Sequence, residues 1–121
     1  MILVDTCIWV EHLRRGNARL KELLSDGEVA CHPFVLGELA CGAIANRAEI
    51  LSLLAALPAG PQAANEEVLL FIERHEFMGR GLGLVDMHLL SSCMLSKVPL
   101  WTQDGRLLKA AHGLGIAADF S

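Results

Sequence analysis

The sequence contains no tyrosine, and aromatic residues make up only 5% of its 121 positions. Proteins that hold single-stranded nucleic acid without sequence preference stack the bases on aromatic side chains. A stacking surface of that kind is therefore not expected here. The two tryptophans, Trp9 and Trp101, are predicted to lie in the hydrophobic core.

A basic surplus is also missing, because 10 lysines and arginines stand against 14 acidic residues, for a net charge of −4. Proteins that coat nucleic acid are basic, so this class is excluded. The balance still permits an enzyme that engages nucleic acid through metal ions. The question it raises is which carboxylates create the acidic surplus.

Long apolar runs are absent too, and none approaches the roughly 18 residues that a membrane-spanning helix needs. Asp5 interrupts the first apolar stretch, so we expect neither a signal peptide nor a membrane span, and hence a cytoplasmic protein. The cysteines form no C-x-x-C pair and lie in apolar segments, which predicts buried, reduced thiols. These are Cys7, Cys31, Cys41 and Cys93. A zinc site at Cys31 and His32 lacks the usual ligand spacing.

Strand and helix patterns alternate along the whole chain, and 53% of the residues are hydrophobic. We therefore predict one domain, residues 1–121, of the α/β class with a mainly parallel sheet. Strands are expected at 1–4, 29–31, 62–64, 98–102 and 116–118. Helices are expected at 7–14, 17–27, 33–44, 46–57, 65–77, 85–96 and 104–111, with Asn17, Asn46 and Asn65 as N-caps and Pro33 opening its helix.

The first strand, Met1-Ile2-Leu3-Val4, is an unbroken apolar run, as in parallel strands covered on both faces. We expect it in the middle of the sheet, with Asp5 at its carboxyl end. Ligands bind at that end of open parallel sheets. A carboxylate there is costly to bury unless something pairs with it.

Three further carboxylates occupy positions where the helical pattern predicts buried apolar residues. Asp86 and Asp104 each share a helical face with leucines three and four residues later, and Glu38 is surrounded by small or apolar neighbours. Local roles also fit two of them, since Asp104 could be a helix N-cap and Asp86 lies in a first turn, where the macrodipole favours negative charge. Incidental placement of all four, Asp5 included, is a poorer explanation than one shared site.

Four carboxylates at one sheet edge would need a cation, because two of them about 4 Å apart repel by about 4 kcal/mol at an effective dielectric constant near 20. Oxygen ligands without His or Cys select Mg²⁺ or Mn²⁺. Such a site suits phosphodiester hydrolysis. Without these four residues the chain would carry equal numbers of acidic and basic groups, so the site accounts for the net charge.

At these residues the chain resembles the PIN-domain nucleases, and among them the VapC toxins of type II toxin–antitoxin (VapBC) pairs. Four segments match in the family's order, across essentially the whole chain: Val4-Asp5-Thr6, Gly37-Glu38-Leu39-Ala40, Gly83-Leu84-Val85-Asp86 and Trp101-Thr102-Gln103-Asp104. The resemblance implies a three-layer α/β/α fold with a central parallel sheet. It implies a Mg²⁺- or Mn²⁺-dependent endoribonuclease whose catalytic and metal-binding residues are Asp5, Glu38, Asp86 and Asp104.

The resemblance further implies that Thr6 and Thr102 support the acids, through hydrogen bonds to carboxylates or to metal-bound water. It implies a homodimer neutralised by a VapB-like antitoxin. Among the basic residues, Arg80 and Arg106 are the candidates for holding RNA phosphates, since the glycine-rich loop around Arg80 leads into Asp86. That loop follows a helix and lacks the P-loop lysine, so a dinucleotide or P-loop site is excluded.

Two other functions stay open on sequence grounds. A Mg²⁺-binding, receiver-like signalling module also gathers Asp residues at strand ends, but it would have a second acidic residue beside Asp5, where Thr6 stands. A catalytically silent PIN-like protein could use the fold only to bind a partner. High hydrophobic content predicts exposed apolar residues on the early helices, around Trp9, Leu13, Leu51 and Leu54, as a docking surface for a partner.

Overall fold

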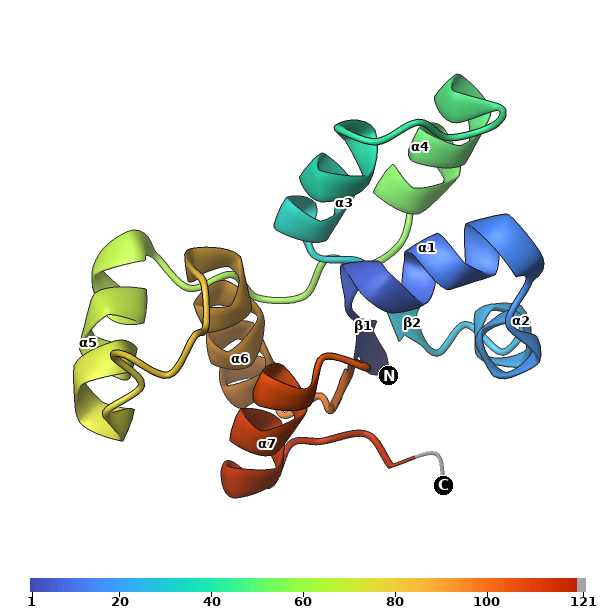
Figure 1. Cartoon of the computed structure of the whole chain (residues 1–121). Coiled ribbons are helices and arrows are strands. Elements are labelled where there is room, and N and C mark those ends of the chain that lie inside the picture. Colours follow the sequence, from blue (N-terminus) through green and yellow to red (C-terminus); the bar gives the residue numbers. More distant parts are fainter. Residues whose placement is uncertain (120–121) are drawn as a thin grey trace.

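A computed structural model describes residues 1–119, with a three-stranded parallel sheet at its centre (Figure 1). The strands are β1 (Ile2–Val4), β2 (Val29–Ala30) and β3 (Leu100–Trp101), in the order β2-β1-β3. In this register Leu3 lies opposite Ala30 on one side and Leu100 on the other. The first strand is thus central, as its unbroken apolar run predicts, and Leu3 and Val4 are buried.

Helices enclose this small sheet and give the chain its three-layer α/β/α arrangement. In Figure 1, α5, α6 and α7 lie on one side of the strands, α1 and α2 on the other, and α3 with α4 above. Their bounds are α1 Thr6–Arg15, α2 Ala18–Ser25, α3 Pro33–Ala40, α4 Arg47–Ala55, α5 Asn65–His75, α6 Leu84–Ser96 and α7 Gly105–Gly113. No helix within residues 1–119 is both long and apolar enough to cross a membrane.

Several helix starts follow from local side-chain chemistry. Asn17 caps α2 by accepting a hydrogen bond from the Leu20 N–H at 3.0 Å, and Pro33 opens α3, both as predicted. Asn46 precedes α4 but has a left-handed backbone and makes no side-chain cap. The cap predicted at Asn65 is wrong by one residue, because Ala64 is the N-cap of α5 and its N–H donates to Glu67.

Two predicted strands and one predicted helix depart most from the structure, and the other predicted bounds agree with it within two residues. Residues 62–64 form no strand: the preceding Pro61 lacks an N–H donor, and only Ala63 of the three is buried. Residues 116–118 reach the sheet only through a single parallel bridge between Leu100 and Ala117. The helix predicted over 33–44 ends at Ala40, two residues before Gly42, which disfavours a further turn.

The burial pattern confirms part of the predicted core. Trp9 and Trp101 are buried, as are Cys31 and Cys93, whereas Cys7 is half-buried and Cys41 is exposed. The apolar docking surface predicted on the early helices is wrong at these positions: Trp9 and Leu54 are buried, while Leu13 and Leu51 are half-buried. The large apolar side chains that are exposed lie mostly elsewhere, several of them on α5 and α6. On these two helices they are Leu69, Leu70, Leu84, Met94 and Leu95.

Candidate active site

Asp5 lies at the carboxyl end of the central strand, where it also serves as the N-cap of α1. Only 8% of its surface is exposed, so its charge needs donors. Its Oδ1 accepts from the Thr6 N–H at 2.8 Å, and its Oδ2 accepts from the Thr102 hydroxyl at 2.7 Å and from the Cys7 thiol at 3.5 Å. These three donors fix the orientation of the carboxylate.

Thr102 connects the Asp5 carboxylate to the backbone of a second acidic residue, Asp104. It is buried directly after β3, and its Oγ1 accepts a hydrogen bond from the Asp104 N–H at 3.0 Å while donating to Asp5. Asp104 is the N-cap of α7, with Oδ1 accepting from the N–H groups of Arg106 at 3.0 Å and Leu107 at 3.2 Å. The neighbouring strands β1 and β3 thereby place two acids at one sheet edge.

Thr6 makes the corresponding connection to Glu38. The Thr6 hydroxyl donates to Glu38 Oε1 at 2.7 Å, while the Thr6 N–H is bound to Asp5. Glu38 is exposed near the C-terminal end of α3, which packs against α1. The two threonines therefore link the carboxylates of Glu38 and Asp5 and the backbone of Asp104 into one hydrogen-bonded chain.

Asp86, the third residue of α6, completes the group. Its Oδ2 accepts from the Gly83 N–H at 2.9 Å, the reciprocal bond of a capping box. Burial raises the pKa of the Asp86 carboxyl, and the charges of Asp5, Asp104 and Glu38 raise it further, against the lowering effect of the Gly83 N–H. The other three carboxylates are thus close enough to act on Asp86 electrostatically.

The local explanations for two of these acids also hold. Asp104 is an N-cap, and Asp86 lies in the first turn of its helix, where an N–H group of the loop satisfies one of its oxygens. Neither role explains why four carboxylates from four different parts of the chain meet at one edge of the sheet. Helix starts and strand ends converge there, so capping and clustering use the same residues.

The donor set fits a hard divalent cation that keeps much of its water. Within residues 1–119 no three His, Cys, Asp or Glu side chains are close enough to form a ready-made metal site. Mg²⁺ does not need one, because it is commonly held by one or two carboxylates with water and substrate phosphate as further ligands. Unused oxygens on Glu38 and Asp104 remain available for such contacts.

Sequence reasoning missed two contributors to this network. The Cys7 thiol contacts Asp5, and its Sγ lies 3.8 Å from Thr102 Oγ1. Burial raises the pKa of Cys7, and the Asp5 charge adds to this, so Cys7 is a neutral donor. Gly83 supplies the N–H that holds Asp86. The sequence could have indicated the contact of Cys7 with Asp5, because Cys7 lies in the first turn of the helix that Asp5 caps.

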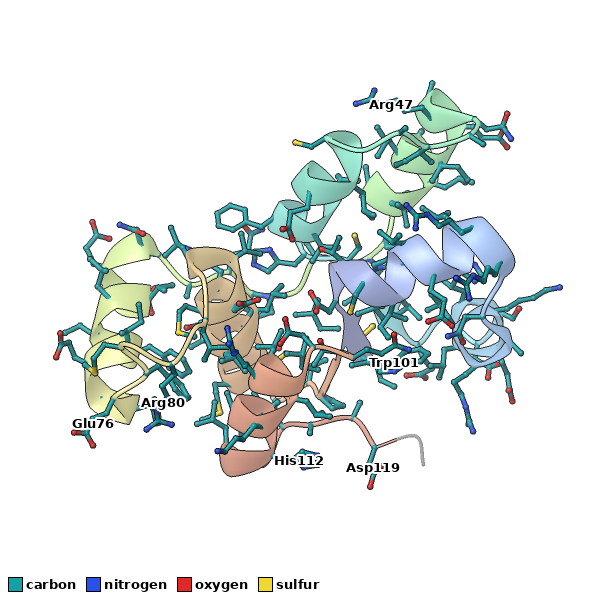
Figure 2. The ribbon with its side chains drawn as sticks, viewed as in Figure 1. Arg47, Glu76, Arg80, Trp101, His112 and Asp119 are labelled. Carbon is teal, nitrogen blue, oxygen red and sulfur yellow. The ribbon has the colours of Figure 1, made fainter. Side chains whose placement is uncertain are left out.

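Within residues 1–119 the side chains of the predicted RNA-binding residues Arg80 and Arg106 form no ion pair with the four carboxylates, although the Arg106 N–H donates to Asp104. Arg80 projects from the segment between α5 and α6 (Figure 2), and its Cζ lies 5.4 Å from the centre of the Phe77 ring. Arg106 lies in the first turn of α7, two residues after Asp104. Both line a cavity whose lining residues include none of the four carboxylates.

Comparison with known proteins agrees with this geometry. The family model of the PIN domain matches residues 2–113, a span that contains all four carboxylates. This chain belongs to the PIN domain family. It is also similar to Ribonuclease VapC32 of Mycobacterium tuberculosis, in strains CDC 1551 / Oshkosh and ATCC 25618 / H37Rv. Each is 49% identical over 118 residues, which cover 97% of this chain and 95% of the relative.

Membership of the PIN family has two consequences. It confirms the resemblance, and with it the α/β fold of a VapC-type PIN domain. It removes the receiver-like alternative, which belongs to another class of α/β protein. A PIN domain that only binds a partner remains as the second function.

Proposed function

We propose that this protein is a Mg²⁺- or Mn²⁺-dependent endoribonuclease that acts as the toxin of a toxin–antitoxin pair. The likeness to the ribonuclease VapC32 supports the activity. The observation that carries the proposal is the group of four acidic residues around the carboxyl end of β1, in which Thr6 links Glu38 to Asp5 and Thr102 links Asp5 to the Asp104 N–H. A role confined to partner binding would not require such an arrangement of like charges.

In this proposal Asp5, Glu38, Asp86 and Asp104 hold the cation, and Thr6 and Thr102 orient three of them. When bound, the divalent ion supplies an activated water molecule and charge stabilisation for phosphodiester hydrolysis. Asp5 is preorganised, because its three donors fix it before any ligand arrives. A cation would favour the ionised form of Asp86, whose pKa is raised by burial and by the charges of the other three carboxylates.

The decisive experiment is RNA cleavage by Asp5→Asn. We expect cleavage to be lost while the protein stays folded, because asparagine has nearly the same shape and keeps one oxygen to accept from the Thr6 N–H, but removes the charge. Asp26→Asn, at an exposed position following α2, is the matched control and should cut RNA like the wild type. Cleavage by Asp5→Asn at the wild-type rate would refute the assignment.

We also propose that an antitoxin of the VapB kind blocks the site, and that the protein forms a homodimer. A cavity of about 410 Å³ between α1, α3 and α4 supports the first point, because it is lined by apolar side chains such as Leu13 and Ile44 and includes Glu38. An arginine of the partner could pair with Glu38 and replace the charge of the cation. The exposed apolar side chains on α5 and α6 offer a surface for the dimer.

Co-expression with the adjacent open reading frame and purification through one tag tests the pairing. We expect a complex with little ribonuclease activity. A soluble monomer recovered alone, with activity unchanged by the neighbouring product, would contradict the proposal. For an enzyme of this kind we propose residues 1–121 as one working domain and the cytoplasm, where RNA is available, as its location.

A further inference from the structure

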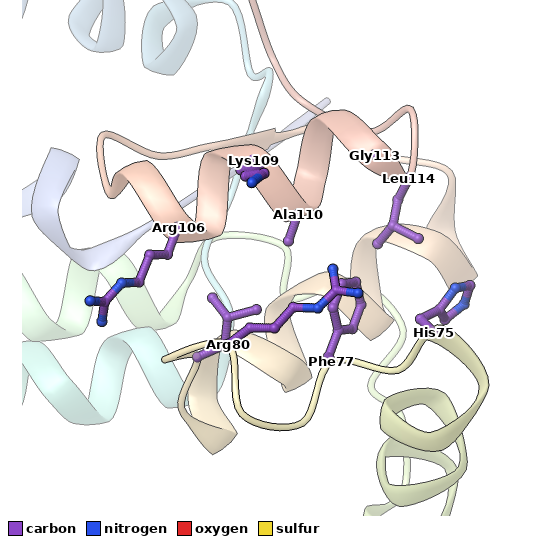
Figure 3. A pocket seen from close by; sticks show the side chains of 9 residues that line it. His75, Phe77, Arg80, Arg106, Lys109, Ala110, Gly113 and Leu114 are labelled. Carbon is purple, nitrogen blue, oxygen red and sulfur yellow. The ribbon is translucent and has the colours of Figure 1, made fainter.

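A cavity of about 670 Å³ lies between α7 and residues 76–83, the segment that joins α5 to α6 (Figure 3). Its cationic lining comes from both sides: Arg80 from the segment, Arg106 and Lys109 from α7. Between these charges the wall is apolar, with Phe77 and Leu114 among its residues. The cavity thus combines apolar walls with three positive charges in a protein whose net charge is −4.

Among the described residues, 1–119, these three side chains form no ion pair with an acidic group. The only ion pair within residues 1–119 joins the N-terminal amine to Glu28, far from the cavity in the sequence. Arg80, Arg106 and Lys109 are all exposed to solvent. A group of uncompensated cations around a hollow is suited to an anion with several charges, which would contact them together.

The Arg106 side chain packs against the backbone of Gly81, in space that is free because glycine has no Cβ. The Gly81 φ of +77° is a left-handed conformation that favours glycine, and a Cβ placed there would lie 2.5 Å from Arg106 Nη1 and 2.9 Å from Arg106 Cζ. The guanidinium therefore rests where a side chain at position 81 would be. Gly79 has a similar φ of +71°, but a Cβ there would meet nothing within 4 Å.

Both walls of the cavity continue into the acidic site. Asp104 caps α7, and Lys109 follows it five residues later, which corresponds to about 7 Å along the helix axis. On the other wall, the loop that carries Arg80 and Gly81 ends at Gly83, whose N–H holds Asp86. An extended polyanion that reaches the carboxylates can therefore run on into the cavity.

We propose that this cavity binds backbone phosphates of the RNA chain next to the phosphate that is cut, and that Arg80, Arg106 and Lys109 contact them. This rests on the proposed ribonuclease function. Gly81 leaves open the space in which the Arg106 guanidinium lies. In the absence of a cation the carboxylates repel RNA, so the metal-independent part of RNA binding comes from the cavity. Arg106 is a binding residue here, and Gly81 is a positioning residue.

The experiment measures binding of a labelled single-stranded RNA to the wild type in EDTA, where no cleavage occurs, over a series of salt concentrations. Arg80→Gln, Arg106→Gln and Lys109→Gln should each weaken binding and make the slope of log K against log salt shallower by about 0.7 for each phosphate that is no longer neutralised. Arg15→Gln and Lys21→Gln, exposed on α1 and α2, should leave the slope unchanged. Equal effects from cavity and control variants would overturn the proposal.

Gly81→Ala and Gly79→Ala form a second, matched pair, since both introduce a Cβ at a positive φ but only the first displaces Arg106. We expect Gly81→Ala to weaken RNA binding more than Gly79→Ala, and to add little when Arg106→Gln is already present. Melting curves identify any variant that is unfolded. Equal binding by the two alanine variants, with both folded, would overturn the role of Gly81.

Failure of this inference can be told from failure of the ribonuclease function. RNA binding in EDTA that depends on the cavity residues, without RNA cleavage in Mg²⁺ or Mn²⁺, would refute the ribonuclease function and support the cavity as a binding site. Metal-dependent RNA cleavage, together with RNA binding that is unchanged by substitution of Arg80, Arg106 and Lys109, would support the ribonuclease function and refute the cavity as a binding site. Loss of partner binding alone in the cavity variants would assign the cavity to a protein and also refute the RNA site.

Discussion

Thr102 and Thr6 are the residues on which the geometry of the acidic site depends. Thr6 follows Asp5 and donates to Glu38 of α3, whereas Thr102 donates to Asp5 and accepts from the N–H of Asp104, the N-cap of α7. Thr102 is also buried, and its hydroxyl uses its donor and acceptor capacity at once. Removing that hydroxyl would leave the Asp104 N–H without its partner and Asp5 with one donor fewer.

Thr102→Val, which keeps the shape of the side chain, should therefore destabilise the protein by about 1–2 kcal/mol. It should also reduce RNA cleavage by about 10- to 100-fold, the usual effect of losing a group that orients a metal ligand. Thr102→Ser restores the hydroxyl and should recover most of the activity. Urea unfolding and cleavage rates measure the two effects, and full activity in Thr102→Val would exclude an orienting role.

At the scale of elements, the N-cap of α3 is a buried histidine, His32, whose ring lies near that of His88 on α6. His32 is 1% exposed, and its Nδ1 accepts from the Phe34 N–H at 3.0 Å, which leaves the ring proton on Nε2. Within residues 1–119 this Nε2 has no hydrogen-bond partner, and the ring of His88 lies 6.4 Å away. Burial, and then the neighbouring His88, lower the pKa of His32 from 6.5 to about 4.

This shift predicts how stability changes with pH. Between pH 6.5 and about 4 the unfolded chain binds a proton at His32 and the folded chain does not, so the free energy of unfolding falls as the pH falls. The slope from this group approaches about 1.4 kcal/mol per pH unit, for a total of roughly 3 kcal/mol.

His32→Asn keeps an acceptor for the Phe34 N–H but does not titrate, so it should flatten the profile over this pH range. His112→Asn, exposed on α7, is the control. Denaturant unfolding at several pH values gives the profiles. Parallel profiles for the wild type and His32→Asn would contradict the assignment.

On the scale of the whole molecule, the acidic site concentrates repulsion where the elements meet. Asp5 follows β1, Glu38 belongs to α3, Asp86 to α6 and Asp104 precedes α7, so four separate segments each bring one like charge to the same place. The free energy of folding therefore includes a repulsive contribution that a bound cation removes. In the proposed function, binding of a metal ion would therefore be coupled to folding through these residues.

We accordingly expect Mg²⁺ or Mn²⁺ to raise the melting temperature relative to EDTA. A ligand at 100 times its Kd stabilises the folded state by about 2.7 kcal/mol. Asp86→Asn should raise the melting temperature in EDTA, because a group with a raised pKa is destabilising when charged, and should reduce the shift caused by metal. Glu66→Gln, exposed on α5, is the control. Identical melting curves in EDTA and excess Mn²⁺ would count against a metal site.

The sequence by itself determined the features that depend on short-range patterns. The apolar run before Asp5 predicts a central strand, Asn17 and Pro33 mark helix starts, and carboxylates at core positions of helices stand out against their neighbours. These signals are readable because strand alternation, helical spacing and capping act over a few residues. They also suffice to recognise the family from four short segments.

Only the tertiary structure decided what depends on residues far apart in the chain. Residues 116–118 look like a strand, but how many of them pair depends on the edge that β3 offers, and here only Ala117 bridges to it. Whether Trp9 is covered, whether Cys7 reaches Thr102 across 95 positions, and whether Gly81 lies against Arg106 are likewise matters of packing. Contacts of this kind arise from the way whole helices and strands pack together, and no local spacing encodes them.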